Sequence, residues 1–142
     1  MTLSSLIKRL EEAEGLIDLE LDAEIDIFLF GGETIWKQIS GSMDMVPASR
    51  RPSKHHIGGF ANEHVPRYSS SIDAAISLAE RVLPGCFYLI GKGKTRHDEP
   101  PFGAQIMFGT DEVLGEGESS ASLSISLVLA TLRAIQSKGE QP

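Results

Sequence analysis

The chain has 142 residues, of which 41% are hydrophobic, and a formal net charge of −7. A chain of this length is expected to fold as one domain and to bury about two thirds of the surface that its unfolded form exposes. The single cysteine excludes an intramolecular disulfide framework, and the longest apolar runs fall far short of the roughly 20 residues of a membrane-spanning helix. The amino-terminal stretch TLSSLIKRLEEAE lacks the apolar core of a signal peptide, so we expect a soluble protein of a reducing cytoplasm.

The charges are divided unevenly along the chain. Residues 1–46 hold ten acids and three bases, a net charge of −7. Residues 47–97 hold three acids and eight bases, a net charge of +5, and residues 98–142 hold seven acids and two bases, a net charge of −5. The negative total argues against general binding to nucleic-acid backbones, which requires clustered Lys and Arg. The middle third could present a basic patch that attracts a small anion or an acidic partner surface.

The amino-terminal part is predicted to form two helices. The first has apolar residues at three- and four-residue spacing, is capped by Thr2 or Ser4, and ends at Gly15. The second is predicted over residues 18–30, before the helix-breaking Gly31, although alternation with period two leaves a strand as the alternative. Eight acids and no base lie between Glu11 and Asp26, many of them on positions of these two helices that are expected to face solvent.

The next part of the chain is predicted to be mostly irregular. Residues 34–39 form a short strand, placed at a sheet edge. Residues 41–66 are predicted to be a long basic loop, because prolines and glycines interrupt any regular pattern there. Loops of this length are uncommon in compact domains, so this one could contain a strand at residues 54–60.

The most regular pattern in the sequence lies between residues 69 and 91. Ser70 is the expected N-cap of an amphipathic helix, and Asp73 completes a capping box. Pro84-Gly85 ends this helix. The aromatic and β-branched run at residues 87–90 is then predicted to be a buried strand directly under the helix.

The last part is predicted to contain a strand, a loop and a helix. Residues 102–108 are expected to pair antiparallel with the preceding strand as a hairpin, and residues 109–118 to form an acidic loop. A helix over residues 120–137, capped by Ser119 or Ser120, has a wide apolar arc and should be central to the core.

The expected elements define an α+β fold. We predict a single domain over residues 1–142, with a small, mostly antiparallel sheet of about three or four strands packed with about four helices. Residues 138–142 are expected to fray as a carboxyl-terminal tail.

The segment Gly91-Lys92-Gly93-Lys94-Thr95 ends like a phosphate-binding loop. The motif GxxxxGK[ST] requires a glycine at position 88, which is Tyr88, and Pro100-Pro101 stands where the phosphate-binding helix would continue. A solvated basic hairpin loop is therefore the favoured interpretation.

Four histidines are candidate metal ligands: His55, His56, His64 and His97. The adjacent pair would point to opposite faces of a strand, and the sequence contains neither HExxH nor HxH. Exposed loop histidines are favoured over a catalytic metal site. We expect no cofactor.

The sequence offers no assembled nucleophilic catalyst. It lacks the GxSxG motif, and residues Ser69–Ser71 are explained as helix caps. Cys86 is interpreted as a small buried residue rather than a nucleophile. We therefore favour a protein that is not an enzyme.

The best binding candidates are six basic residues in two predicted loops: Arg50, Arg51, Lys54, Lys92, Lys94 and Arg96. Guanidinium groups bind phosphate or carboxylate in a bidentate way, and loops commonly carry function. Both loops flank the predicted sheet and could converge there. Ordinary solvation of these side chains is the alternative.

Three segments carry a resemblance to a known family: Leu6–Glu11 (LIKRLE), Pro66–Ala75 (PRYSSSIDAA) and Ala130–Ala134 (ATLRA). In this order and setting the chain resembles the phage ABA sandwich domain family of small bacteriophage proteins. The resemblance extends over nearly the whole chain. Residues 31–65 look longer and more basic than is usual in that family, and the strand after Gly85 lacks the usual tryptophans. The resemblance implies an αβα sandwich made in the bacterial host cytoplasm, and it implies no activity.

The favoured hypothesis is a non-catalytic phage or prophage accessory protein that binds a host protein or a small anionic ligand, in host takeover or counter-defence. The chain is compatible with a homo-oligomer. One alternative is a metal-dependent hydrolase of a nucleotide or phosphoester, using the histidines with Asp98 or Glu99. Another is an acidic inhibitor whose first two helices mimic DNA.

Overall fold

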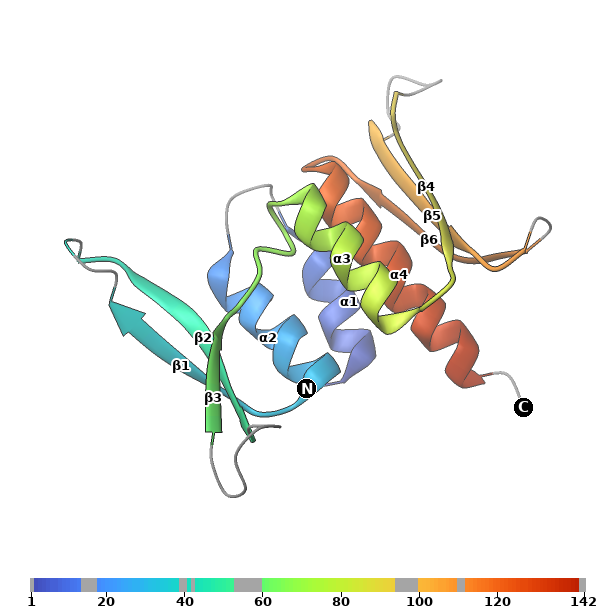
Figure 1. Ribbon diagram of the computed structural model, residues 1–142. Helices are drawn as coiled ribbons and strands as arrows, with labels where there is room; N and C mark the ends of the chain where they lie inside the picture. The colour runs from blue at the N-terminus through green and yellow to red at the C-terminus, as the bar shows by residue number, and fades with distance from the viewer. Residues whose placement is uncertain are drawn as a thin grey trace. The chain divides into compact units, whose positions relative to one another are not determined.

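The computed structural model of the protein describes residues 2–13, 18–38, 41, 43–52, 60–93, 100–109 and 112–140. These residues form four helices and six strands, which confirms the α+β class (Figure 1). The strands belong to two three-stranded antiparallel sheets, in the orders β1-β2-β3 and β4-β5-β6. The single domain expected over residues 1–142 divides into two compact units, one of residues 18–66 and one of residues 1–17 with 67–142.

The unit of residues 18–66 contains one helix and one sheet. Its elements are α2 (Leu19–Phe30), β1 (Glu33–Gln38), β2 (Met45–Pro52) and β3 (Phe60–His64). The Asp18 carboxylate caps α2 by accepting the N–H of Leu21 at 3.0 Å, and Gly31 ends the helix with a φ of 75°. The helix predicted over residues 18–30 is confirmed, and the alternative interpretation of this segment as a strand is wrong. The helix α2 packs on β2.

Residues 41–66 are not a long loop, because they contain β2 and β3. Pro47 lies inside the central strand, opposite Trp36 of β1. A proline lacks only the N–H, and the carbonyl of Pro47 still accepts the N–H of Val65 at 3.3 Å. The expected edge strand at 34–39 is confirmed as β1, whereas most of the strand considered at 54–60 lies outside the described residues.

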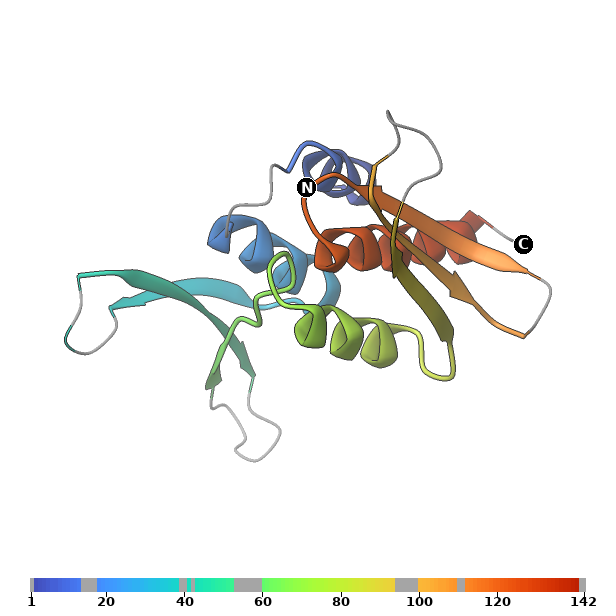
Figure 2. The same cartoon turned by 90° about the horizontal axis from the view of Figure 1, so that it is seen from above.

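The second unit is built around its last helix. Its elements are α1 (Leu3–Glu11), α3 (Ile72–Val82), β4 (Phe87–Lys92), β5 (Phe102–Met107), β6 (Val113–Ser119) and α4 (Leu123–Glu140). All side chains from 124 to 132 of α4 are buried, and α1, α3 and the sheet pack around this helix (Figures 1 and 2). The predicted central helix is therefore confirmed.

The helix ends in this unit differ from the predictions by a few residues. Thr2 caps α1 as expected, while the predicted end at Gly15 lies outside the described residues. Ser71, rather than Ser70, caps α3, so Asp73 does not complete a capping box. Ser122 caps α4 by accepting the N–H of Ile125 at 3.1 Å.

Of the residues expected to fray, 138–142, the first three belong to the last turn of α4. Residues 141–142 lie outside the described part of the chain.

The strand at residues 87–90 is not buried. It belongs to β4, an edge strand, in which Phe87 is 61% exposed and Leu89 is 58% exposed. The helix α3 packs on α4, and the strand that contacts α4 most closely is β6. The predicted hairpin of β4 with β5 is confirmed, with Phe87 opposite Met107, whereas the predicted acidic loop at 109–118 contains most of β6.

Two glycines of β6 permit this close packing. A Cβ atom at Gly115 would lie 2.6 Å from the backbone nitrogen of Ala134, and one at Gly117 would lie 2.8 Å from that of Ala130. Such distances are shorter than van der Waals contact, so only glycine allows the backbone of α4 to approach β6 this closely.

Candidate functional site

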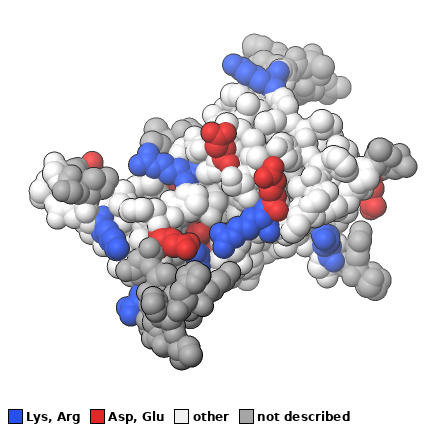
Figure 3. Space-filling view, viewed as in Figure 1, with Lys and Arg blue, Asp and Glu red and all other residues white. Residues whose placement is uncertain are grey.

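The structure describes three of the six predicted basic residues. Arg50 and Arg51 lie in β2, and Lys92 ends β4, so these three residues belong to different compact units. The other three predicted residues, Lys54, Lys94 and Arg96, lie outside the described residues. Figure 3 shows described Lys and Arg side chains interspersed with Asp and Glu on the face in view.

Arg51 has a structural role in its unit. Its guanidinium forms an ion pair with the carboxylate of Asp26, which is only 2% exposed and also accepts the hydroxyl of Ser49. The Nε of Arg51 donates to the carbonyl of Gly31 at 3.1 Å, and its Cζ lies 5.5 Å from the ring centroid of Phe30. These contacts join the end of α2 to the sheet, and they occupy the groups that would bind an anion.

Arg50 and Lys92 are more accessible. The Nη1 atom of Arg50 lies 3.6 Å from the Oε1 atom of Glu33 on the neighbouring strand, in an exposed pair that contributes little to stability. The Nζ atom of Lys92 lies 5.7 Å from the ring centroid of Phe102. Both side chains therefore have a neighbour but keep exposed surface.

Most residues of the alternative metal site, and part of the loop that resembles a phosphate-binding motif, lie outside the described residues. His64 is exposed at the end of β3, and the other three histidines lie outside the described residues, as do Asp98 and Glu99. Within the described part of the chain, no three His, Cys, Asp or Glu residues are grouped as a metal site. The N–H of Gly93 donates to the carbonyl of Pro101 at 2.7 Å, which closes the end of the β4–β5 hairpin.

The acids of α2 are less exposed than the sequence indicated. Asp22 is fully buried, and Asp26 is engaged by Arg51 and Ser49. The helix therefore does not present a continuous acidic face of the kind that a DNA mimic needs.

Cys86 precedes β4, and its Sγ lies 3.8 Å from the carbonyl oxygen of Ala79. Burial, together with the negative charge of Glu80, raises the pKa of the Cys86 thiol above its ordinary value. A raised pKa leaves less thiolate near neutral pH, and the thiolate is the nucleophilic form.

We therefore expect Cys86 to react more slowly with iodoacetamide at pH 7.5 than the same cysteine in the urea-unfolded chain. The rate should increase as the pH is raised, because the thiol deprotonates only at higher pH than an ordinary thiol. Mass spectrometry of quenched samples measures this rate. Equal rates in the folded and unfolded chains would contradict the assignment.

Among the described residues, two adjoining grooves lie over the outer face of the β4-β5-β6 sheet. The helix α4 packs on the opposite face, which carries the buried side chains of Ala104 and Ile106. The strand pairing defines the outer face in rows. One row is Leu89, Gln105 and Glu116; the next is Gly91, Gly103 and Glu118.

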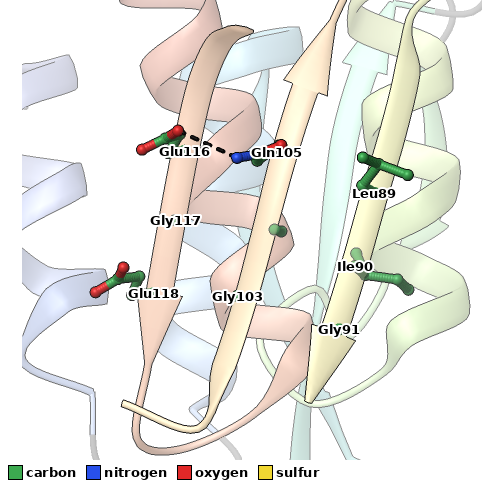
Figure 4. Close-up of a pocket in the computed structure, with 9 residues that line it drawn as sticks. Leu89, Ile90, Gly91, Gly103, Gln105, Glu116, Gly117 and Glu118 are labelled. Carbon is green, nitrogen blue, oxygen red and sulfur yellow. Dashed lines mark hydrogen bonds between the residues drawn. The ribbon is translucent and has the colours of Figure 1, made fainter. Parts of the chain in front are cut away.

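A groove of about 310 Å³ lies over these two rows (Figure 4). An adjoining groove of about 630 Å³ extends past Lys92 and Phe102, and it shares Gly91, Gly103 and Glu118 with the first. Gln105 donates to the Glu116 carboxylate at 3.2 Å, which holds that side chain over the sheet.

This face carries both exposed apolar side chains and exposed carboxylates. The apolar side chains are Phe87, Leu89 and Val113. Of the two carboxylates, Glu116 shares a row with Leu89, and Glu118 shares a row with Gly91 and Gly103. Neither groove is lined by Cys86 or by His64, the one histidine among the described residues. The sequence signal for the two carboxylates was the alternation Gly115-Glu116-Gly117-Glu118, which has the period of a strand.

Comparisons with protein-family models, with curated proteins and with solved structures found no match. Among the described helices, none has the length and apolar character needed to cross a bilayer.

Proposed function

We propose that this protein is a non-catalytic binding protein whose partner is another protein, docked on the outer face of the β4-β5-β6 sheet. The exposure of Phe87 and Leu89 at the edge of that face carries the proposal. Large apolar side chains in contact with water favour burial against a partner. The grooves beside them provide a concave surface into which partner side chains can fit.

The resemblance to phage ABA sandwich proteins supports a biological setting for this binding. In that setting the protein is a phage or prophage accessory protein, made in the cytoplasm of a bacterial host, and its partner is a host protein. A small anionic ligand is less favoured, because Glu116 and Glu118 would repel it from the grooves.

The proposal predicts that a double substitution, Phe87→Ser with Leu89→Ser, weakens partner binding at least about 30-fold, since each apolar side chain that a partner buries contributes about 1–2 kcal/mol. The partner is first recovered from bacterial lysate on the wild-type protein and identified, and the purified pair is then measured by titration calorimetry. Circular dichroism checks that the variant remains folded.

Met43→Ser is the matched control, because Met43 is 88% exposed and lies in the other compact unit. This control should leave the dissociation constant unchanged. The proposal is wrong if the double variant binds the purified partner as tightly as the wild type, or if no purified protein binds with a measurable dissociation constant.

A further inference from the structure

The row of the outer sheet face that contains Glu118 has an unusual floor. Gly91 of β4 pairs with Gly103 of β5, and Gly103 in turn pairs with Glu118 of β6. In this row, β4 and β5 therefore place no side chain on the groove. The third strand, β6, contributes Glu118, whose carboxylate lies at the border of the groove (Figure 4). A Cβ atom at Gly91 would meet nothing within 4 Å, and one at Gly103 would meet only a backbone oxygen at 4.0 Å.

These glycines are not required by the fold in the way that Gly115 and Gly117 are. Neither Gly91 nor Gly103 has a positive φ, and a larger residue would fit sterically at either position. A glycine in a strand interior costs stability, and it commonly marks a place where another group approaches the backbone. The pair therefore indicates a surface kept open for an incoming group.

We infer that this glycine floor receives a cationic side chain, an arginine or lysine, from an extended segment of the protein partner. The inference rests on the proposed function and adds the chemistry of the partner. The aliphatic stem of the side chain lies along the bare backbone of Gly91 and Gly103, and its charged head reaches the carboxylates of Glu118 and Glu116. Lysine and arginine have the required combination of apolar stem and cationic end.

The spacing of the two carboxylates defines the segment further. Glu116 and Glu118 are alternate residues on one face of β6, so their Cα atoms are separated by roughly 7 Å. Alternate residues of an extended partner segment have the same separation. Two cations two residues apart would therefore face both carboxylates, and the residue between them would point to the opposite side of the segment, where Leu89 of β4 lies across the sheet from β6.

The test uses a defined probe, the peptide acetyl-Leu-Arg-Leu-Arg-Ser-amide, added to the full-length ¹⁵N-labelled protein. Amide shifts in the NMR spectrum locate the peptide, and titration gives its dissociation constant. We expect the largest shifts at Gly91, Gly103 and Gly117. Replacing both arginines by citrulline removes the charge and keeps the shape, and it should weaken binding at least about tenfold.

Three variants separate the parts of the inference. Glu118→Gln should weaken the arginine peptide about tenfold and leave the citrulline peptide unchanged. Gly103→Val should weaken both peptides, because the branched side chain fills the floor of the groove while suiting a strand. Glu80→Gln makes an equal change of charge on the exposed face of α3, and it should leave the affinity for both peptides unchanged. The methyl signals of α4 verify that each variant is folded.

Three results would overturn the inference. One is equal affinity for the arginine and citrulline peptides; another is a Glu118→Gln variant that binds both like the wild type. The third is an absence of shifts at the sheet glycines. None of these contradicts the proposed function, which depends on Phe87 and Leu89 and on the purified partner. The Phe87→Ser and Leu89→Ser variant could lose partner binding while one of these three results is also found. The proposed docking face would then stand, and only the selection of a cationic side chain would be wrong.

Discussion

Replacing either Gly115 or Gly117 by alanine is expected to lower the free energy of unfolding by about 3 kcal/mol or more. At Gly115 the new Cβ would lie against the carbonyl oxygen of Ala130 and 3.0 Å from the Cβ of Ala134. At Gly117 it would lie 2.8 Å from the Cβ of Leu129. Because these neighbours are helix backbone and Cβ atoms, they cannot rotate away, and α4 would have to move from the sheet.

Urea unfolding followed by circular dichroism at 222 nm measures this effect. Gly103→Ala is the matched control, since the same substitution on the outer face of the same sheet meets only a backbone oxygen at 4.0 Å. That variant should keep its stability or gain about 0.5 kcal/mol, because alanine restricts the unfolded chain more than glycine does. If all three variants had the same stability, the close contact of β6 with α4 would be wrong.

The helices were predictable from the sequence because their signals are local. The helix α2 begins after Asp18 and ends at Gly31, as expected from the sequence. The wide apolar arc of the last helix correctly predicted that this helix lies in the core. The errors at Ser71 and Ser122 arose because neighbouring serines compete to cap the same turn.

The strands were harder to predict because their signals depend on what packs against them. In β6, Gly115 and Gly117 have low strand propensity in isolation, and only the approach of α4 explains them. In β4, the apolar run from Phe87 has the composition of a buried strand but lies at the sheet edge. Composition alone does not distinguish a core strand from an exposed one.

The contacts of one predicted site residue, Arg51, could not be predicted for a related reason. A basic residue in a presumed loop suggested anion binding, but Arg51 lies in a strand whose neighbour Asp26 is twenty-five positions earlier in the chain. No local pattern joins these two residues. The face that we propose for binding depends on strand register, which sets Leu89, Gly103 and the two carboxylates on one side of the sheet.

The ion pair of Arg51 provides the second large expected effect. Asp26→Asn should lower the unfolding free energy of the unit of residues 18–66 by about 3 kcal/mol, because it leaves a largely buried guanidinium beside a neutral amide. The single tryptophan of the chain, Trp36, lies in β1 of this unit, so its fluorescence in urea follows the relevant transition.

Glu33→Gln is the control for Asp26→Asn, since it makes the same change of charge in the same unit beside an exposed arginine, Arg50. It should alter the Trp36 transition by less than about 0.5 kcal/mol, because solvent screens exposed pairs. A double variant, Asp26→Leu with Arg51→Met, should recover part of the loss, since it leaves neither charge without its partner. Equal effects of Asp26→Asn and Glu33→Gln would contradict the assignment of the Asp26–Arg51 pair as a stabilising contact between α2 and the sheet.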